Sequence, residues 1–448
     1  MSKQTGDTKG SLSTLREFAF SSLVTKALSI LIRVGKNVLF TRLLGPEGRG
    51  VYGLLMNTPT LVVSFGNLGF GLGLFYLAAK KKADLRTLIG NALLYAVIHG
   101  ALLYLLGVFL FHLQDLGYFP MDGSATIRPY VLAAIPLLLL YNLSLDLFVG
   151  AKAIHSMNVL SLFFSILPII VMLLLYSLTG DVLSAALYSW VLTLGVIGVV
   201  SFGRLLKLAG GWPKLSMPLA VQAFQFGVRG CGSQFTDSIV RRVDLLFLAH
   251  YWSAAEVGQY AVATSVAEIL LALPESVSTP FMSLRLGMED GEGKHFSSLV
   301  IKYVLFIMFT ICLLTGIAAW PLIMLLFGRP FLPSLWPFFW LLPGIMGLSL
   351  YPFLKTDVLG VGRPGLLSQV STVTMFVNLA LNFLLIPRFG ASGAAISSSA
   401  SYLLSSFVLL VFVAKKSGLP AREILFMRSA DFIMIKDLFR SKFLGKRR

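Results

Sequence analysis

Long apolar segments alternate with short polar ones along almost the whole chain. A helix of about 20 apolar residues crosses a bilayer, and glycine, proline and charge clusters divide the sequence into about twelve such segments. The predicted spans are residues 17–43, 50–79, 87–112, 127–150, 157–179, 182–206, 218–250, 256–283, 297–327, 333–355, 366–387 and 391–414. This pattern predicts an all-α integral membrane protein.

Basic residues are distributed unevenly between these segments. The connections after even-numbered spans hold most of them: Lys80, Lys81, Lys82, Arg86, Lys152, Arg204, Lys207, Lys214, Arg285, Lys294, Arg363, Lys415 and Lys416. The other connections hold little beyond Arg49, Arg128, Arg329 and Arg388. Because cytoplasmic loops are enriched in lysine and arginine, both termini are predicted to be cytoplasmic.

The composition agrees with a membrane protein and narrows the function classes. Of the 448 residues, 56% are hydrophobic and 13% charged, whereas soluble domains carry about a quarter charged residues. Lysine and arginine number 37 against 20 aspartate and glutamate, a net charge of +17. Nucleic-acid-binding proteins keep such an excess on a solvated face, but here it lies at the ends of apolar spans and within a few of them. No nucleic-acid partner is therefore expected.

The chain contains an internal repeat. A shift of 208 residues places Arg33 on Arg241 and residues 50–52 (GVY) on residues 258–260 (GQY). An even number of spans per copy gives both copies the same orientation, so we expect two six-helix bundles related by a pseudo-two-fold axis along the membrane normal. The predicted parts are a polar cytoplasmic N-terminus (1–16), two bundles (17–210 and 211–416) and a basic amphipathic cytoplasmic tail (417–448).

Span one carries Lys26, Arg33 and Lys36 on one helical face. A central lysine or arginine costs roughly 2.5–3.5 kcal/mol on insertion, whereas each large aliphatic residue contributes roughly 0.3–0.6 kcal/mol. Two central bases nearly cancel the apolar contribution of this span, so we expect that face to line water rather than contact lipid.

Span seven carries a matching set of charges, among them Arg229, Arg241 and Arg242. Two arginines that converge from the two copies suit a dianion, because the guanidinium fork pairs with phosphate oxygens bidentately. The residues predicted to line a substrate cavity are Arg33, Lys36, Arg241, Lys26, Arg229 and Arg242. The alternative is that Asp237 or Asp244 neutralises Arg241 within its own helix.

Acidic residues within the spans are candidates for coupling transport to an H⁺ or Na⁺ gradient, since a buried carboxylate can exchange protons near neutral pH. They are Glu268, Glu275, Asp244, Asp237 and Asp146. The alternative is that they neutralise neighbouring basic residues. No cofactor is expected, because the glycine-rich stretch 287–294 lacks the P-loop spacing, and no catalytic constellation or metal motif is present. The sequence predicts a secondary transporter, not an enzyme.

Span two is rich in residues that weaken or bend a helix. Gly69 and Gly73 have the spacing that permits close contact between helices, and Pro59 can kink the chain. Helix packing and a bending gate are both open interpretations at this point.

Three stretches resemble the polysaccharide-transporter branch of the multidrug/oligosaccharidyl-lipid/polysaccharide exporter superfamily. Residues 41–52 (TRLLGPEGRGVY) are similar to the end of span one in that family, and residues 243–260 to its junction of spans seven and eight. Residues 378–399, with Asn382, a stretch IPRFG and then GAA, resemble a further family signature.

The resemblance implies a flippase that moves undecaprenyl-pyrophosphate-linked oligosaccharide, such as an O-antigen repeat unit, to the outer leaflet of the bacterial inner membrane. It also implies alternating access around a basic central cavity, membrane lipids as surroundings and polysaccharide polymerase or chain-length proteins as partners. A cation-coupled multidrug antiporter of the same fold is the alternative. Cationic drugs need buried carboxylates as counter-ions, however, and the core of span one carries bases only.

Overall fold

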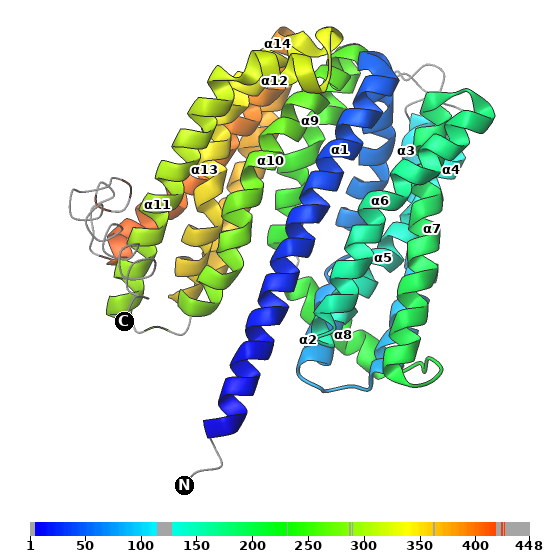
Figure 1. The fold of residues 1–448 in the computed structure, drawn as a ribbon, viewed down its shortest axis with the longest axis vertical. Coiled ribbons are helices and arrows are strands. Elements are labelled where there is room, and N and C mark those ends of the chain that lie inside the picture. The colour runs from blue at the N-terminus through cyan, green and yellow to red at the C-terminus, as the bar shows by residue number, and fades with distance from the viewer. Residues whose placement is uncertain are drawn as a thin grey trace. The chain divides into compact units, whose positions relative to one another are not determined.

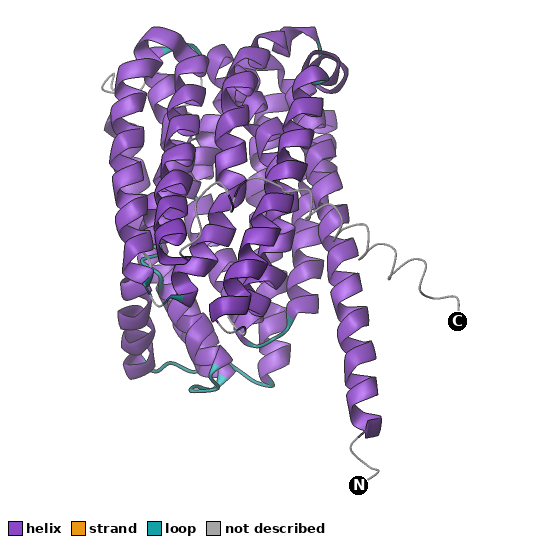
Figure 2. Ribbon diagram, turned by 90° about the vertical axis from the view of Figure 1, so that its left-hand side faces the viewer, coloured by secondary structure: helices purple, strands orange, loops and turns teal. Residues whose placement is uncertain are grey.

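The computed structural model describes residues 5–113, 128–230, 232–285, 288, 290–361, 363–417, 423 and 425. Within these residues the chain is helical apart from short connections, and it contains no strand (Figures 1 and 2). The prediction of an all-helical protein is confirmed. The predicted amphipathic tail, residues 417–448, lies outside the described residues except for Ser417, Glu423 and Leu425.

Contacts divide the chain into two compact units, residues 1–261 and 262–448. The predicted division at 210/211 rests on the repeat and stays a prediction. The first unit contains α1 (Thr5–Gly66), α2 (Phe70–Ala79), α3 (Leu85–Leu113), α4 (Arg128–Leu132), α5 (Ala134–Gly150), α6 (Ile154–Thr179), α7 (Val182–Ala209), α8 (Met217–Gly230) and α9 (Gly232–Tyr251). Helix α10 (Ala254–Arg285) begins in the first unit and ends in the second. The second unit continues with α11 (Asp290–Ile317), α12 (Ala319–Leu326), the 3₁₀ helix η2 (Arg329–Ser334), α13 (Leu335–Gly360) and α14 (Pro364–Ser417).

Seven helical segments among the described residues are long and apolar enough to cross a membrane. They are Leu85–Phe109, Ile154–Thr179, Val182–Ala209, Ala254–Met282, Gly293–Ile317, Arg329–Gly360 and Gly365–Lys416. The shorter helices α2 and α5 are also apolar. Many large apolar side chains on these segments are exposed, as on Leu178, Val199 and Leu314. Exposed apolar helix surface of this extent suits contact with lipid rather than water.

Two helices each contain a reversal that separates two predicted spans. In α1 the backbone leaves helical geometry at Gly45 (φ 67°, ψ 179°), a left-handed conformation that favours glycine. Beyond it the chain folds back, so Phe40 packs edge-on against Tyr52 with ring centroids 5.8 Å apart. Gly390 (φ 55°, ψ −132°) does the same in α14. The predicted spans one and two are therefore joined at one glycine rather than by a loop of several residues.

Span two is interrupted between α1 and α2, a break that was not predicted. Leu68 and Gly69 adopt positive φ, which leaves the last carbonyl oxygens of α1 without helical partners. The hydroxyl of Tyr95 on α3 donates to the carbonyl oxygens of Gly66 and Asn67, at 3.3 and 3.1 Å. The ring of His99 also hydrogen-bonds to the Gly66 carbonyl.

The two glycines of span two serve helix packing. A Cβ atom on Gly73 would lie 2.0 Å from the carbonyl oxygen of Ala223, and one on Gly227 would lie 2.1 Å from that of Gly69. Helices α2 and α8 therefore touch backbone to backbone at these residues. The packing interpretation is confirmed.

Candidate functional site

The segment of α1 that follows Gly45 brings a third basic residue, Arg49, to the basic face of span one. Arg33 is exposed and Lys36 half-buried, and the charges of both Arg33 and Arg49 act on the Lys36 ammonium group. Arg49 belongs to the segment that follows Gly45. The structure therefore brings Arg33, Lys36 and Arg49 together, and we call these three residues the α1 basic cluster.

Arg49 is held in place from both sides of the reversal. Its Nη2 donates to Asn37 Oδ1 at 2.9 Å, and its guanidinium carbon lies 5.6 Å from the centre of the Tyr52 ring. A cation over an aromatic face is stabilised by the ring quadrupole. These two contacts fix the position of the Arg49 guanidinium group.

Helix α9 places two further arginines in the first unit. The side chains of Arg241 and Arg242 are exposed, and neither forms an ion pair with another described residue. Among the described residues Arg241 makes no direct ion pair with Asp237 or Asp244. Whether either carboxylate neutralises Arg241 stays an open alternative. Helix α1 packs against α9, and the buried Asn57 side chain donates from Nδ2 to the carbonyl oxygen of Arg242 at 2.9 Å.

Asp244 faces the interior of the α9–α10 hairpin. Its side chain is 2% exposed, and it accepts hydrogen bonds from the Tyr260 hydroxyl and from the backbone N–H of Leu245, the latter at 2.8 Å. Asp244 thus joins the two helices of this hairpin. Asp237 is half-buried and lies about two turns earlier on α9.

The remaining predicted residues are placed as follows. Arg229 is exposed on α8. Lys26 belongs to α1, but its side chain lies outside the described residues. Glu268 and Glu275 are exposed on the part of α10 that belongs to the second unit. The proximity of Arg33 to Arg241, which the repeat suggests, stays a prediction.

Asp146 on α5 has a different environment from the other acidic candidates. It is half-buried, and its Oδ2 atom occupies the space beside Gly71 of α2, only 1.9 Å from where a Cβ atom on that glycine would be. It makes no hydrogen bond or ion pair with any residue that the structure describes. Asp146 is therefore a half-buried carboxyl group on an apolar helix, without a hydrogen bond or ion pair among the described residues.

Sequence reasoning placed Arg49 in a connection and missed its part in the cluster. The signal is present in the sequence, because Gly45 and Pro46 mark a sharp reversal. Only the backbone path through Gly45 in the structure shows that the Arg49 side chain lies near that of Lys36. The same reasoning assigned Arg285 to topology alone and overlooked Asp357, its buried partner at 2.7 Å.

Comparison with known proteins places the chain in a family. Residues 39–335 match a family described as polysaccharide biosynthesis proteins. The sequence matches none of the curated proteins with which it was compared.

Several solved structures share the fold. The lipid II flippase MurJ in an inward closed conformation is 14% identical, with 95% of this chain and 93% of that chain covered and a TM-score of 0.73. An inward-facing multidrug resistance MATE transporter of the MOP superfamily is 13% identical, with 89% and 98% covered and a TM-score of 0.72. A mutant of the Vibrio cholerae MATE transporter VcmN is 16% identical, with 90% and 97% covered and a TM-score of 0.62.

The family match and the shared fold confirm the resemblance drawn from the sequence motifs. The apolar helices and the transporter fold make this a multi-pass membrane protein. The side of the membrane on which the termini lie stays a prediction.

Proposed function

Because the chain belongs to the polysaccharide biosynthesis protein family, we propose that it flips undecaprenyl-pyrophosphate-linked oligosaccharide repeat units across the bacterial inner membrane. The repeat unit would move from the cytoplasmic to the outer leaflet by alternating access. The observation that carries this proposal is a set of exposed arginines on α1 and α9 that make no ion pair with a described residue: Arg33, Arg241 and Arg242.

In the predicted spans one and seven, guanidinium groups that make no ion pair with a described residue need water or an anion, because lipid solvates them poorly. A pyrophosphate supplies several oxygen atoms in the geometry that an arginine fork pairs with bidentately. Lys36 and Arg49 add positive potential beside Arg33. This arrangement favours an anionic headgroup and disfavours a cationic drug, the substrate of the alternative antiporter.

We further propose that Asp146 couples transport to an H⁺ or Na⁺ gradient. Among the five acidic candidates, Asp146 is half-buried and makes no hydrogen bond or ion pair with a described residue. Glu268 and Glu275, in contrast, are exposed. A carboxyl group in such a place can change its protonation or bind a cation as the surrounding helices move. No other cofactor is proposed.

Deletion of the gene in its host tests the proposal. We expect lipid-linked repeat units to accumulate in the cytoplasmic leaflet and surface glycan to disappear, with both reversed by a plasmid copy. Susceptibility to cationic dyes and drugs is measured in the same strains. Unchanged glycan export combined with increased drug susceptibility would replace the flippase by the drug antiporter.

A further inference from the structure

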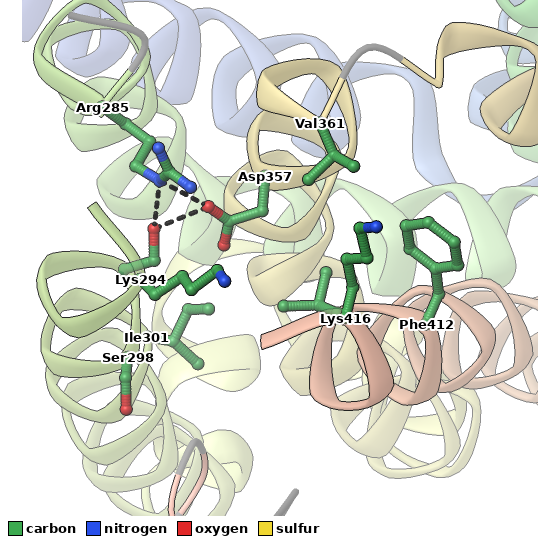
Figure 3. Close-up of a pocket in the computed structure, with 10 residues that line it drawn as sticks. Arg285, Lys294, Ser298, Ile301, Asp357, Val361, Phe412 and Lys416 are labelled. Atoms are coloured by element: carbon green, nitrogen blue, oxygen red, sulfur yellow. Dashed lines mark hydrogen bonds and ion pairs between the residues drawn. The ribbon is translucent and has the colours of Figure 1, made fainter. Parts of the chain in front are cut away.

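A polar pocket lies in the second unit, where four helix ends meet. Helix α10 ends at Arg285, α11 begins at Asp290, α13 ends at Gly360 and α14 ends at Ser417. Part of its lining comes from Arg285, Lys294, Asp357 and Lys416 (Figure 3). The pocket therefore opens at one end of these membrane helices, at the level expected for lipid headgroups.

The floor of the pocket is a buried ion pair. Arg285 Nε donates to Asp357 Oδ1 at 2.7 Å and to Ser297 Oγ at 3.0 Å, while the Ser297 hydroxyl donates to Asp357 Oδ1 at 2.7 Å. Only 3% of the Arg285 side chain and 6% of the Asp357 side chain are exposed. The Arg285 charge is thus already neutralised.

Three polar groups in the pocket are left without partners among the described residues. The Lys294 and Lys416 side chains extend into it on either side of Asp357 in Figure 3, and neither makes an ion pair with a described residue. The second carboxylate oxygen, Asp357 Oδ2, is buried and accepts no hydrogen bond from them. The pocket therefore offers two cations and one hydrogen-bond acceptor to a ligand.

The remaining wall is apolar and comes from Ile301, Val361, Phe412 and Val413. A soluble phosphate has no apolar surface to bury against this wall. The glycerol backbone and first methylene groups of a phospholipid do have such surface and would bury it there. Basic pockets between membrane helices near the cytoplasmic surface are known to suit anionic lipid headgroups.

We propose that this pocket binds the headgroup of an anionic phospholipid that carries both a phosphate and a hydroxyl, with phosphatidylglycerol as the simplest example. Lys294 and Lys416 hold the phosphate, and Asp357 Oδ2 accepts a hydrogen bond from the headgroup hydroxyl. The site is separate from the proposed transport function, since all of its residues belong to the second unit and none to the basic residues of α1 and α9.

The test uses the full-length protein in phosphatidylcholine nanodiscs, titrated with phosphatidylglycerol and analysed by native mass spectrometry. Lys294→Gln and Lys416→Gln should each weaken binding about fivefold. Lys415→Gln, which removes the same charge from a neighbour that does not line the pocket, should leave binding within about twofold of wild type. A thermal melt of each variant confirms that it is folded.

Two results would overturn the proposal. An equal loss in the Lys415→Gln variant would mean that binding is diffuse attraction to a basic surface. Glycerol 3-phosphate that competes at the same concentration as the lipid would identify a soluble phosphate as the ligand.

Discussion

Gly50 packs against the start of α10 at Ala254, and Gly258 of α10 packs against Pro46, just after the α1 reversal. A Cβ atom on Gly50 would lie 1.8 Å from the carbonyl oxygen of Ala254, and one on Gly258 would lie 1.9 Å from the carbonyl oxygen of Pro46. Gly258 and Ala254 stand 208 positions after Gly50 and Pro46, the shift of the internal repeat. Such mutual contact between equivalent residues is what the pseudo-two-fold relation predicted from the repeat would produce.

This contact predicts that neither glycine tolerates a side chain. Gly50→Ala and Gly258→Ala should each lower stability by about 1–3 kcal/mol, because the added methyl group meets backbone atoms that cannot rotate away. Gly53→Ala is the matched control, since its Cβ atom would lie 3.9 Å from that of Ala261, an ordinary contact. Melting temperatures in detergent measure the difference. Equal melting temperatures for Gly50→Ala and Gly53→Ala would contradict the close contact.

The cavity hypothesis predicts strong effects at Arg33 and Arg241. Loss of a charge-assisted hydrogen bond costs about 1.5–3 kcal/mol, so Arg33→Ala and Arg241→Ala should each reduce glycan export about 10- to 100-fold in a complementation assay. Replacement by lysine should restore only part of the export, because the fork geometry is lost. Membrane fractions show whether each variant is inserted. Wild-type export from both alanine variants would exclude a role for these residues in substrate binding.

Arg49 should matter as a member of the α1 basic cluster. Arg49→Gln removes the charge beside Lys36 and should reduce export about tenfold, whereas Arg49→Lys keeps the charge but not the full contact with Asn37 and should have a smaller effect. Arg204→Gln removes an equal charge from an exposed position on α7 and serves as the control. The prediction fails if the Arg49 and Arg204 variants export equally well.

Several features of the fold follow from local sequence, and these were predictable. Apolar runs mark the helices, and Gly45 beside Pro46 marks the first reversal. Gly69 and Gly73 have the spacing of a packing motif, and α2 uses both against α8. Each of these signals is carried within a few residues.

Features that depend on distant residues were not predictable. The break before Gly69 is stabilised by Tyr95 and His99, which belong to α3. The hydrophobic pattern of span two itself does not indicate a break. In the candidate site, the bases of span one could be read from helical spacing. The approach of Arg49 to Lys36 and the pairing of Arg285 with Asp357, 72 positions apart, require the tertiary structure.

The coupling proposal predicts a specific defect for Asp146→Asn. The amide has nearly the same shape, so it should fit beside Gly71 and leave the protein folded, but it cannot bind a proton or attract a cation. In proteoliposomes with an imposed H⁺ or Na⁺ gradient, flipping by this variant should no longer respond to the gradient. The exposed Glu268→Gln and Glu275→Gln variants provide the comparison. A response that survives in Asp146→Asn and disappears in either glutamine variant would move the coupling site to α10.

The buried pair in the second unit predicts a non-additive response to mutation. Asp357→Ala leaves the Arg285 guanidinium buried without its anion and should destabilise the protein by about 3–5 kcal/mol, because desolvation of an unpaired charge is costly. The double variant Arg285→Met/Asp357→Leu removes both charges and should recover most of that loss, since apolar residues of similar volume can replace a buried pair. Ser297→Ala removes only a neutral partner and should cost about 1 kcal/mol. Chemical or thermal unfolding of the wild type, Arg285→Met, Asp357→Leu and the double variant completes the cycle, with Asp357→Ala and Ser297→Ala measured beside them. A double variant as unstable as the sum of Arg285→Met and Asp357→Leu would show that Arg285 and Asp357 do not act as a pair.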